Sequence, residues 1–395
     1  MIIGLVGKPS SGKSTFFKAA TLAEVAIAPY PFTTIEKNEG VAYIKTECVE
    51  ADFKVKCQPK FGYCLNGIRF IPSKLIDVAG LVPGAHAGKG RGNQFLDDLR
   101  EADILIHIVD ASGKTNAEGN PAEDYNVLEE VRFLQDEIDL WLYGMLEKKW
   151  ATFSRKVAQE GKLADELTKQ LSGLKVKEEA VVRVMKVLNL SESVLKWKKE
   201  DVLSFARGIR KESKPIIIAA NKADTKTAEA NIKKMKEAFP ETLIIPCSSE
   251  SELALREAAK HGLIDYVPGD AEFKIKGELS EQQQKALSFV EENILKKYGN
   301  TGVQQCLNAA IFDFLGMVVA YPVDNESKLA DKYGKVLPDA FLMPRGATAL
   351  DFAEKIHTDF VKTFAGAIDV RTHKRLAREY KIKDKDILKI ITGKY

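Results

Sequence analysis

The chain has 395 residues, of which 45% are hydrophobic and 29% charged, and its formal net charge is +3. This length and composition suit about two to four globular domains, each with its own core, and so small a charge excludes a general polyanion binder. No apolar run reaches the roughly 18 residues of a membrane span, and residues 1–6 run directly into a motif, which leaves no room for a signal peptide. We therefore expect a cytoplasmic protein.

The first motif follows an apolar run, residues 2–6, and precedes a helical stretch, residues 15–20. It reads GKPSSGKS, a complete Walker A loop. Between a strand and a helix, the backbone N–H groups of such a loop point together at phosphate oxygens, which a chance Gly/Ser turn would not explain. We expect Lys13 to reach the β- and γ-phosphates and Ser14 to bind Mg²⁺. The predicted phosphate contacts come from Gly7, Lys8, Pro9, Ser10, Ser11, Gly12, Lys13, Ser14 and Thr15.

Two further segments complete a predicted magnesium and γ-phosphate site. In the sequence PYPFTT, residues 29–34, Thr34 rather than Thr33 is expected to bind Mg²⁺ only in the triphosphate state. An apolar strand, residues 70–76, ends in DVAG, where Asp77 would hold Mg²⁺ through water. The N–H of Gly80 would sense the γ-phosphate.

Hydrolysis needs a group that orients the attacking water. In Ras-like enzymes a glutamine directly after DxxG does this, but here the position is Leu81. His86 is the best substitute, because a histidine can act as a base near neutral pH; the alternative is a solvent-exposed loop histidine. The predicted catalytic residues are Lys13, Thr34 and His86.

The base-recognition signal is NKAD at residues 221–224, directly after the apolar run 215–220. The carboxylate of Asp224 can accept hydrogen bonds from both N1–H and N2–H₂ of guanine, a donor pair that adenine lacks. Asn221 would buttress the loop, and the stem of Lys222 would cover one face of the base. After the strand 242–246, backbone N–H groups of Cys247, Ser248 and Ser249 are expected to contact the guanine O6.

About a hundred residues separate the strand 104–109 from the next apolar strand, far more than one crossover helix requires. Apolar residues within 124–210 recur every three or four positions. We therefore predict a nucleotide-binding domain of residues 1–118 and 211–270, interrupted by an antiparallel helical hairpin at 119–210. This insertion is either a contact arm for RNA or protein or a solvated helical pair without a partner.

The last part of the chain changes character. A helical linker is expected at 271–315, and residues 316–395 combine short strands with a helix that Thr348 would cap, as in a small β-grasp domain. Four cations at helical spacing, Arg371, Lys374, Arg375 and Arg378, suggest a phosphate-facing ridge for RNA. A solvated surface helix would explain the same residues.

The five cysteines include no CxxC pair and no histidine at ligand spacing, which argues against a zinc site. Cys57 and Cys64 flank a turn-like segment and could approach each other across a hairpin. Reduced thiols are the default in the cytosol, and a disulfide is plausible only in a hyperthermophile.

The order GKPSSGKST, PYPFTT, DVAG, NKAD and CSS resembles a translation-factor-class GTPase. The run DVAGLVPGAHAGKGRGNQFL, residues 77–96, is similar to the Obg-related GTPases and their YchF branch, and PRGATALDFAEKIH, residues 344–357, resembles a TGS domain. The resemblance implies Mg²⁺, slow hydrolysis, a regulatory role and association with ribosomes. The intact NKAD favours GTP. Many relatives have an asparagine where this chain has Ser10, which puts K⁺ stimulation in doubt.

These features predict an α/β fold: a P-loop NTPase with a Ras-like, mostly parallel sheet, an inserted helical hairpin and a C-terminal β-grasp TGS domain. The expected function is a monomeric regulatory GTPase whose nucleotide controls ribosome or RNA binding through the insertion and the TGS domain. One alternative is a YchF-type ATPase. Another, suggested by Leu81, is a nucleotide-gated scaffold with negligible hydrolysis. A metabolic kinase is disfavoured, because no acceptor site stands beside the nucleotide motifs.

Overall fold

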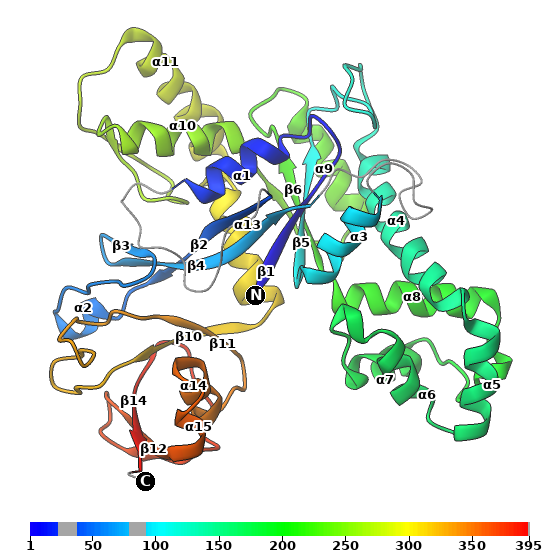
Figure 1. Cartoon of the computed structure of the whole chain (residues 1–395). Coiled ribbons are helices and arrows are strands. Elements are labelled where there is room, and N and C mark those ends of the chain that lie inside the picture. Colours follow the sequence, from blue (N-terminus) through cyan, green and yellow to red (C-terminus); the bar gives the residue numbers. More distant parts are fainter. Residues whose placement is uncertain (23–37, 79–91, 394–395) are drawn as a thin grey trace.

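A seven-stranded sheet forms the centre of the computed structural model, which describes residues 1–22, 38–78 and 92–393. The strand order is β2-β4-β1-β5-β6-β7, and β3 pairs with β4 (Figure 1). Strands β4, β1, β5, β6 and β7 run parallel, whereas β2 and β3 are antiparallel to β4. The bounds are β1 Ile2–Val6, β2 Glu39–Glu47, β3 Tyr63–Leu65, β4 Ile68–Asp77, β5 Ile104–Asp110, β6 Ile216–Asn221 and β7 Ile244–Pro246. The predicted mostly parallel sheet is confirmed.

Helices cover both faces of this sheet, because its parallel strands are apolar on both sides. Ile104 and Ile106 of β5 belong to one core with Phe16 of α1, and Leu105 between them joins a second core with Leu99 of α3. The helices packed against the sheet include α1 Lys13–Thr21, α3 Gly92–Glu101, α9 Ala228–Ala238, α10 Ser249–Lys260 and α13 Val303–Asn308. A short α2, Glu50–Phe53, follows β2.

The segment predicted as a linker packs onto the sheet. A two-stranded ladder, β8 Ile264–Asp265 with β9 Lys274–Ile275, precedes α11 Glu281–Val290, a π-helical segment Glu291–Leu295 and α12 Lys296–Tyr298. Helix α13 runs on into a second π-helical segment, Ala309–Phe314. Val303, Leu307 and Ile311 are buried in the same core as β1 and β5. Residues 303–314 therefore form part of the helical layer on the sheet.

The insertion contains the predicted helical pair, with three shorter helices between its two members. Helices α4 Val127–Glu147 and α8 Lys199–Ser213 pack on each other, and α5 Trp150–Glu160, α6 Leu163–Gln170 and α7 Glu178–Val187 lie between them in sequence. Leu146, Val181 and Phe205 are fully buried there. The sequence periodicity thus identified helices but not their number, because short helices share the spacing of long ones.

The C-terminal region builds a separate five-stranded sheet of order β11-β10-β14-β12-β13. Its elements are β10 Met317–Pro322, β11 Phe341–Pro344, α14 Ala349–Ile356, α15 Phe360–Thr363, β12 Phe364–Asp369, β13 Arg375–Leu376 and β14 Asp386–Thr392. Thr348 caps α14 in a reciprocal capping box with Asp351, as predicted. In Figure 1 this sheet lies at the lower left, and helices α5, α6 and α7 of the insertion lie at the lower right.

The proposed basic ridge is wrong. Residues 371–378 form a turn and the short strand β13, because His373 adopts a left-handed conformation (φ 56°) that no helix accommodates. Arg371 instead donates to Asp52 Oδ2 of the first domain at 2.7 Å, and Arg378 lies 3.8 Å from its neighbour Glu379. These cations therefore do not form one helical face.

All five cysteines are free thiols, so the disulfide considered for Cys57 and Cys64 is not present. Across residues 1–22, 38–78 and 92–393, every helix is too short or too polar to cross a membrane.

Candidate nucleotide-binding site

The Walker A loop joins β1 to α1 in a backbone shape that only certain residues allow. A side chain at Gly7 would lie 2.6 Å from the carbonyl oxygen of Ile108, and one at Gly12 would lie 2.2 Å from Asn221 Nδ2. Gly12 also has a φ of 93°, which L residues rarely adopt. Both loop glycines are thus required by close packing against neighbouring strands.

The loop presents the N-terminus of α1 as an anion site. The first intrahelical hydrogen bond runs from Phe16 N–H to Gly12 O at 2.9 Å, and among the described residues no side chain caps the helix. The N–H groups of the first turn therefore lack intrahelical acceptors and suit phosphate oxygens. Pro9, Ser10 and Ser14 are exposed on this surface, whereas Ser11 is buried.

Lys13 and Asp77 meet at the carboxyl edge of the sheet. Strands β1 and β4 are parallel neighbours with Leu5 opposite Asp77, so β4 ends beside the loop. The ammonium of Lys13 donates to the carboxylate of Asp77 and, at 2.9 Å, to the carbonyl oxygen of Val78. The Asp77 carboxylate and the exposed hydroxyl of Ser14 are oxygen ligands of the kind that Mg²⁺ prefers.

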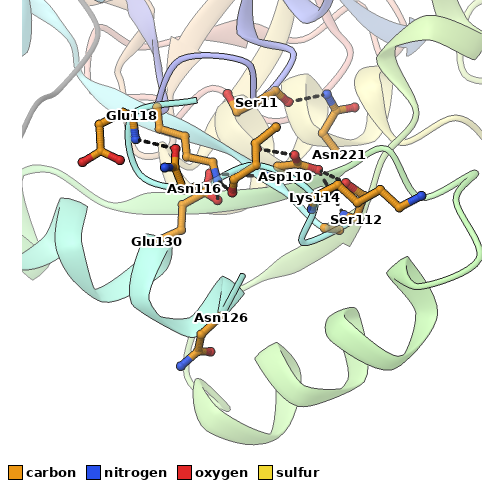
Figure 2. Close-up of polar contacts among 12 residues, drawn as sticks. Ser11, Asp110, Ser112, Lys114, Asn116, Glu118, Asn126, Glu130 and Asn221 are labelled. Atoms are coloured by element: carbon orange, nitrogen blue, oxygen red, sulfur yellow. Dashed lines mark hydrogen bonds and ion pairs between the residues drawn. The ribbon is translucent and has the colours of Figure 1, made fainter. Parts of the chain in front are cut away.

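Asn221 ties the phosphate loop to the base-recognition loops. Its Nδ2 donates to the carbonyl oxygen of Ser11 at 2.9 Å, as Figure 2 shows. Its Oδ1 accepts from the N–H of Ser249 at 3.0 Å and from Ser249 Oγ at 2.9 Å. Asn221 is only 3% exposed. One side chain thus holds three loops together.

Asp224 is partly exposed, and a hydrogen bond from Ser248 orients its carboxylate. Ser248 Oγ donates to Asp224 Oδ1 at 2.8 Å, and the same hydroxyl caps α10 by accepting from Ser251 N–H. Within the described part of the chain, Oδ2 of Asp224 accepts no hydrogen bond. The carboxylate is therefore held in place while acceptor capacity remains for a base.

The backbone N–H groups of residues 247–249 all donate hydrogen bonds within the protein. The N–H groups of Cys247, Ser248 and Ser249 donate to Ala220 O at 2.9 Å, Thr301 O at 2.9 Å and Asn221 Oδ1 at 3.0 Å. All three residues are buried. In this conformation none of these three backbone donors is free for the guanine O6.

Lys222 pairs with Asp110, which the sequence analysis did not single out. Lys222 Nζ lies 2.8 Å from Asp110 Oδ2, and Ser112 and Thr115 also donate to this carboxylate, each at 2.5 Å. Burial alone would raise the pKa of Asp110, but the hydrogen bonds from Lys222, Ser112 and Thr115 outweigh it and lower the pKa. The sequence feature that could have identified Asp110 is its position as an acidic residue at the end of a fully buried strand.

Lys8 turns away from the phosphate surface, although its backbone belongs to the loop. Its ammonium lies 3.0 Å from Glu130 Oε2 on α4 and over the ring of Tyr125, and it is 4% exposed. Burial raises the pKa of Glu130 to about 7 against the lowering effect of Lys8. Glu130 Oε1 also accepts from the N–H of Asp110 at 3.2 Å (Figure 2). The phosphate loop is thereby joined to the insertion.

The remaining predicted site residues fall elsewhere. Thr15 is partly buried in the first turn of α1. Thr34, Gly80, Leu81 and His86 lie outside the described residues.

Comparison with known families matches three parts of the chain. Residues 2–141 match the 50S ribosome-binding GTPase family, and residues 333–392 match the TGS domain. Residues 219–325 match the family described as Obg-like GTPase YGR210-like, G4 motif-containing domain.

Several proteins are similar to this chain over most of its length. An uncharacterized GTP-binding protein of Methanocaldococcus jannaschii is 49% identical over 99% of both chains. A ribosome-binding ATPase YchF of Mycoplasma genitalium is 29% identical over 91% of this chain and 86% of its own. The crystal structure of a GTP-binding protein from Pyrococcus horikoshii superimposes with a TM-score of 0.79 at 39% identity, covering all of both chains. The structure of a YchF GTPase from Schizosaccharomyces pombe has a TM-score of 0.60 at 19% identity, covering 99% of this chain and 97% of its own.

Proposed function

The chain belongs to the Obg-like GTPases, in their YchF-like branch with a C-terminal TGS domain, and from this premise we propose that it is a GTP-preferring regulatory GTPase. It would hydrolyse GTP slowly with Mg²⁺ and associate with the ribosome according to the bound nucleotide. We further propose that it works in the cytoplasm as a monomer.

The observation that carries the preference for GTP is the state of Asp224. Ser248 holds one carboxylate oxygen at 2.8 Å, and Asn221 fixes the loop from the other side by hydrogen bonds to Ser11 and Ser249. A fixed carboxylate favours the paired donors N1–H and N2–H₂ of guanine. It disfavours adenine, which would leave it unpaired.

For hydrolysis, we assign the charge-neutralising roles to residues at the sheet edge. Ser14 and Asp77 would hold Mg²⁺ together with Thr34, and the ion would stabilise charge on the β- and γ-phosphate oxygens. Lys13 contacts Asp77 and Val78 in this structure, and it would exchange these acceptors for phosphate oxygens. His86 would position the attacking water. Turnover would stay low until a partner binds.

The ribosomal role is supported by relatives, since several YchF proteins are named ribosome-binding ATPases. The chain itself offers a mechanical link, because Lys8 of the phosphate loop is paired with Glu130 of the insertion at 3.0 Å. We propose that the insertion contacts the ribosome and that its position depends on the nucleotide.

Calorimetric titration with GDP, IDP and ADP tests the base preference. We expect ADP to bind at least about 100-fold more weakly than GDP, with IDP in between because it lacks the N2 amino group. Asp224→Asn should abolish the difference between GDP and IDP. Equal binding of ADP and GDP would overturn the proposal.

That last result would favour an ATPase, the second candidate, which the names of the YchF relatives support. Turnover measured with and without ribosomes addresses hydrolysis. A rise in GTP turnover with ribosomes is expected, whereas absent turnover in both conditions would favour a nucleotide-gated scaffold.

A further inference from the structure

Three of the five cysteines gather with one glutamate beside the docking surface of the C-terminal domain. Cys48 follows β2, Glu50 begins α2, Cys57 lies in the following loop and Cys64 is on β3. One ligand atom from each of these four residues lies within 4.8 Å of all the others. The sequence spacing argued against such a site, because no two of these cysteines form a CxxC pair. The β2–β3–β4 hairpin region brings distant ones together.

The distances match those of a tetrahedral metal centre. The sulfur atoms of Cys48 and Cys57 are 3.8 Å apart, and the sulfur of Cys64 is 3.5 Å from Glu50 Oε1. Tetrahedral bonds of about 2.3 Å from zinc to sulfur and about 2.0 Å to oxygen require about 3.8 Å between two sulfurs and about 3.5 Å between sulfur and oxygen.

The carboxylate of Glu50 is oriented as a single-oxygen ligand. Its Oε2 accepts from the backbone N–H of Cys57 at 2.7 Å, which leaves Oε1 turned toward Cys64. Outer hydrogen bonds of this kind fix metal-binding carboxylates in proteins. The same loop that carries Cys57 therefore holds the fourth ligand in place.

A buried cation, Arg69, lies near the cluster, where it interacts electrostatically with Cys48 and with the carboxylate of Asp339. Three thiolates and one carboxylate carry four negative charges and Zn²⁺ two positive ones. The resulting anionic centre would balance Arg69.

We propose that Cys48, Cys57, Cys64 and Glu50 bind one structural Zn²⁺. Zinc is the best candidate because three thiolates and one carboxylate in a tetrahedron suit a borderline-soft ion without redox chemistry. With all four positions filled by protein, the site is closed to substrate and its role is structural.

The structure places this centre where the C-terminal domain docks. Gln58 and Lys60, between two of the cysteines, donate backbone hydrogen bonds to the carbonyls of Val336 and Pro338, each at 2.8 Å. Arg69 donates to the carbonyls of Leu337 and Pro338 at 3.0 and 2.7 Å. Zinc would hold the 48–64 segment in the shape that this interface requires.

The experiment is metal analysis of the full chain purified anaerobically with a reductant. We expect about one zinc ion per chain, its loss in Cys57→Ser and in Cys64→Ser, and its retention in Cys306→Ser, a control at a buried cysteine outside the cluster. Glu50→Gln should weaken zinc binding by at least about 10-fold.

Co²⁺ titration of the metal-stripped wild-type chain provides an answer even if the cysteine variants do not fold. Tetrahedral thiolate ligation gives a charge-transfer band in the near ultraviolet and strong ligand-field absorption in the red, both reversed by added Zn²⁺. Any one of three results would overturn the proposal: absence of these bands, unchanged zinc content in Cys57→Ser, or a Cys48–Cys57 disulfide in the anaerobically purified chain. GDP affinity is expected to be the same with and without zinc, so this test is independent of the proposed function.

Discussion

The substitution Asn221→Ala tests whether one buried side chain organises the nucleotide site. Asn221 makes three hydrogen bonds of 2.9 to 3.0 Å, one to the carbonyl of Ser11 and two from Ser249. Alanine would remove all three and leave the carbonyl of Ser11 and the N–H of Ser249 buried without partners.

The expected cost follows from these two orphaned groups. Each buried, unpaired backbone group costs about 1–3 kcal/mol, so the variant should lose about 2–6 kcal/mol of unfolding free energy. The phosphate loop would also lose its attachment to β6. Because Gly12 packs directly against Asn221, we expect GDP affinity to fall by about 10- to 100-fold.

Denaturant unfolding and calorimetric titration with GDP measure the two effects. Asn231→Ala is the matched control, since Asn231 donates a single hydrogen bond of 2.9 Å to the carbonyl of Ala111 and belongs to neither loop. The control should cost about 1 kcal/mol and leave GDP affinity unchanged. If Asn221→Ala bound GDP as tightly as the wild type, the bracing role of Asn221 would be refuted.

Three further substitutions give separate expectations. Gly12→Ala places a methyl group 2.2 Å from Asn221 Nδ2 at a φ of 93°, so GDP titration should show at least about 100-fold weaker binding, and near-normal affinity would contradict the packing argument. Thr348→Ala removes the capping box of α14 and should cost about 1 kcal/mol in thermal unfolding without affecting GDP binding. The pKa of Glu130 is raised from 4.5 to about 7, so the folded state keeps a proton that the unfolded chain releases, and stability falls as pH rises between these values. Glu130→Gln should have about the same free energy of unfolding as the wild type at pH 4 and be about 3 kcal/mol more stable at pH 8. A variant less stable than the wild type at pH 8 would show that the pair with Lys8 outweighs the cost of burying the charge.

The sequence predicted those parts of the fold that depend on local pattern. The apolar runs of β1, β5 and β6 are continuous because both faces of a parallel sheet are buried. The Walker A loop was recognisable because its glycines and lysine have fixed spacing along one short segment. Thr348 was recognisable as a cap for the same reason, since a capping box spans only four residues.

Contacts between residues that are distant along the chain could not be predicted from local sequence pattern. The pairing of Lys8 with Glu130 connects the phosphate loop to a helix that is distant along the chain. No sequence motif at either residue indicates that the other is its partner. The cysteine cluster likewise depends on how β3 pairs with β4, which brings Cys64 next to Glu50. Charge spacing alone misled at residues 371–378, because His373 turns the chain into the β12–β13 hairpin.

The two outer domains are attached to the nucleotide domain in different ways, and this predicts which of them responds to nucleotide. The C-terminal domain is fixed at the β2–β4 edge by the bonds of Arg69 to Leu337 and Pro338. The insertion packs on β5 and α9 through α4, and the pair of Lys8 with Glu130 also ties it to the phosphate loop itself.

A shift of the loop backbone on nucleotide binding must therefore move or break a buried ion pair with α4. The C-terminal contacts of Arg69 instead lie at the start of β4, at the opposite end of that strand from Asp77 and the phosphate loop. Hydrogen exchange should show changed protection at residues 127–131 between the GDP state and a non-hydrolysable GTP analogue, and unchanged protection at 336–342. The opposite pattern, with changes confined to the C-terminal domain, would mean that the signal leaves the site by a route other than Lys8. Abolition of the change at 127–131 in Lys8→Met, with GDP still bound, would establish the ion pair as the connection.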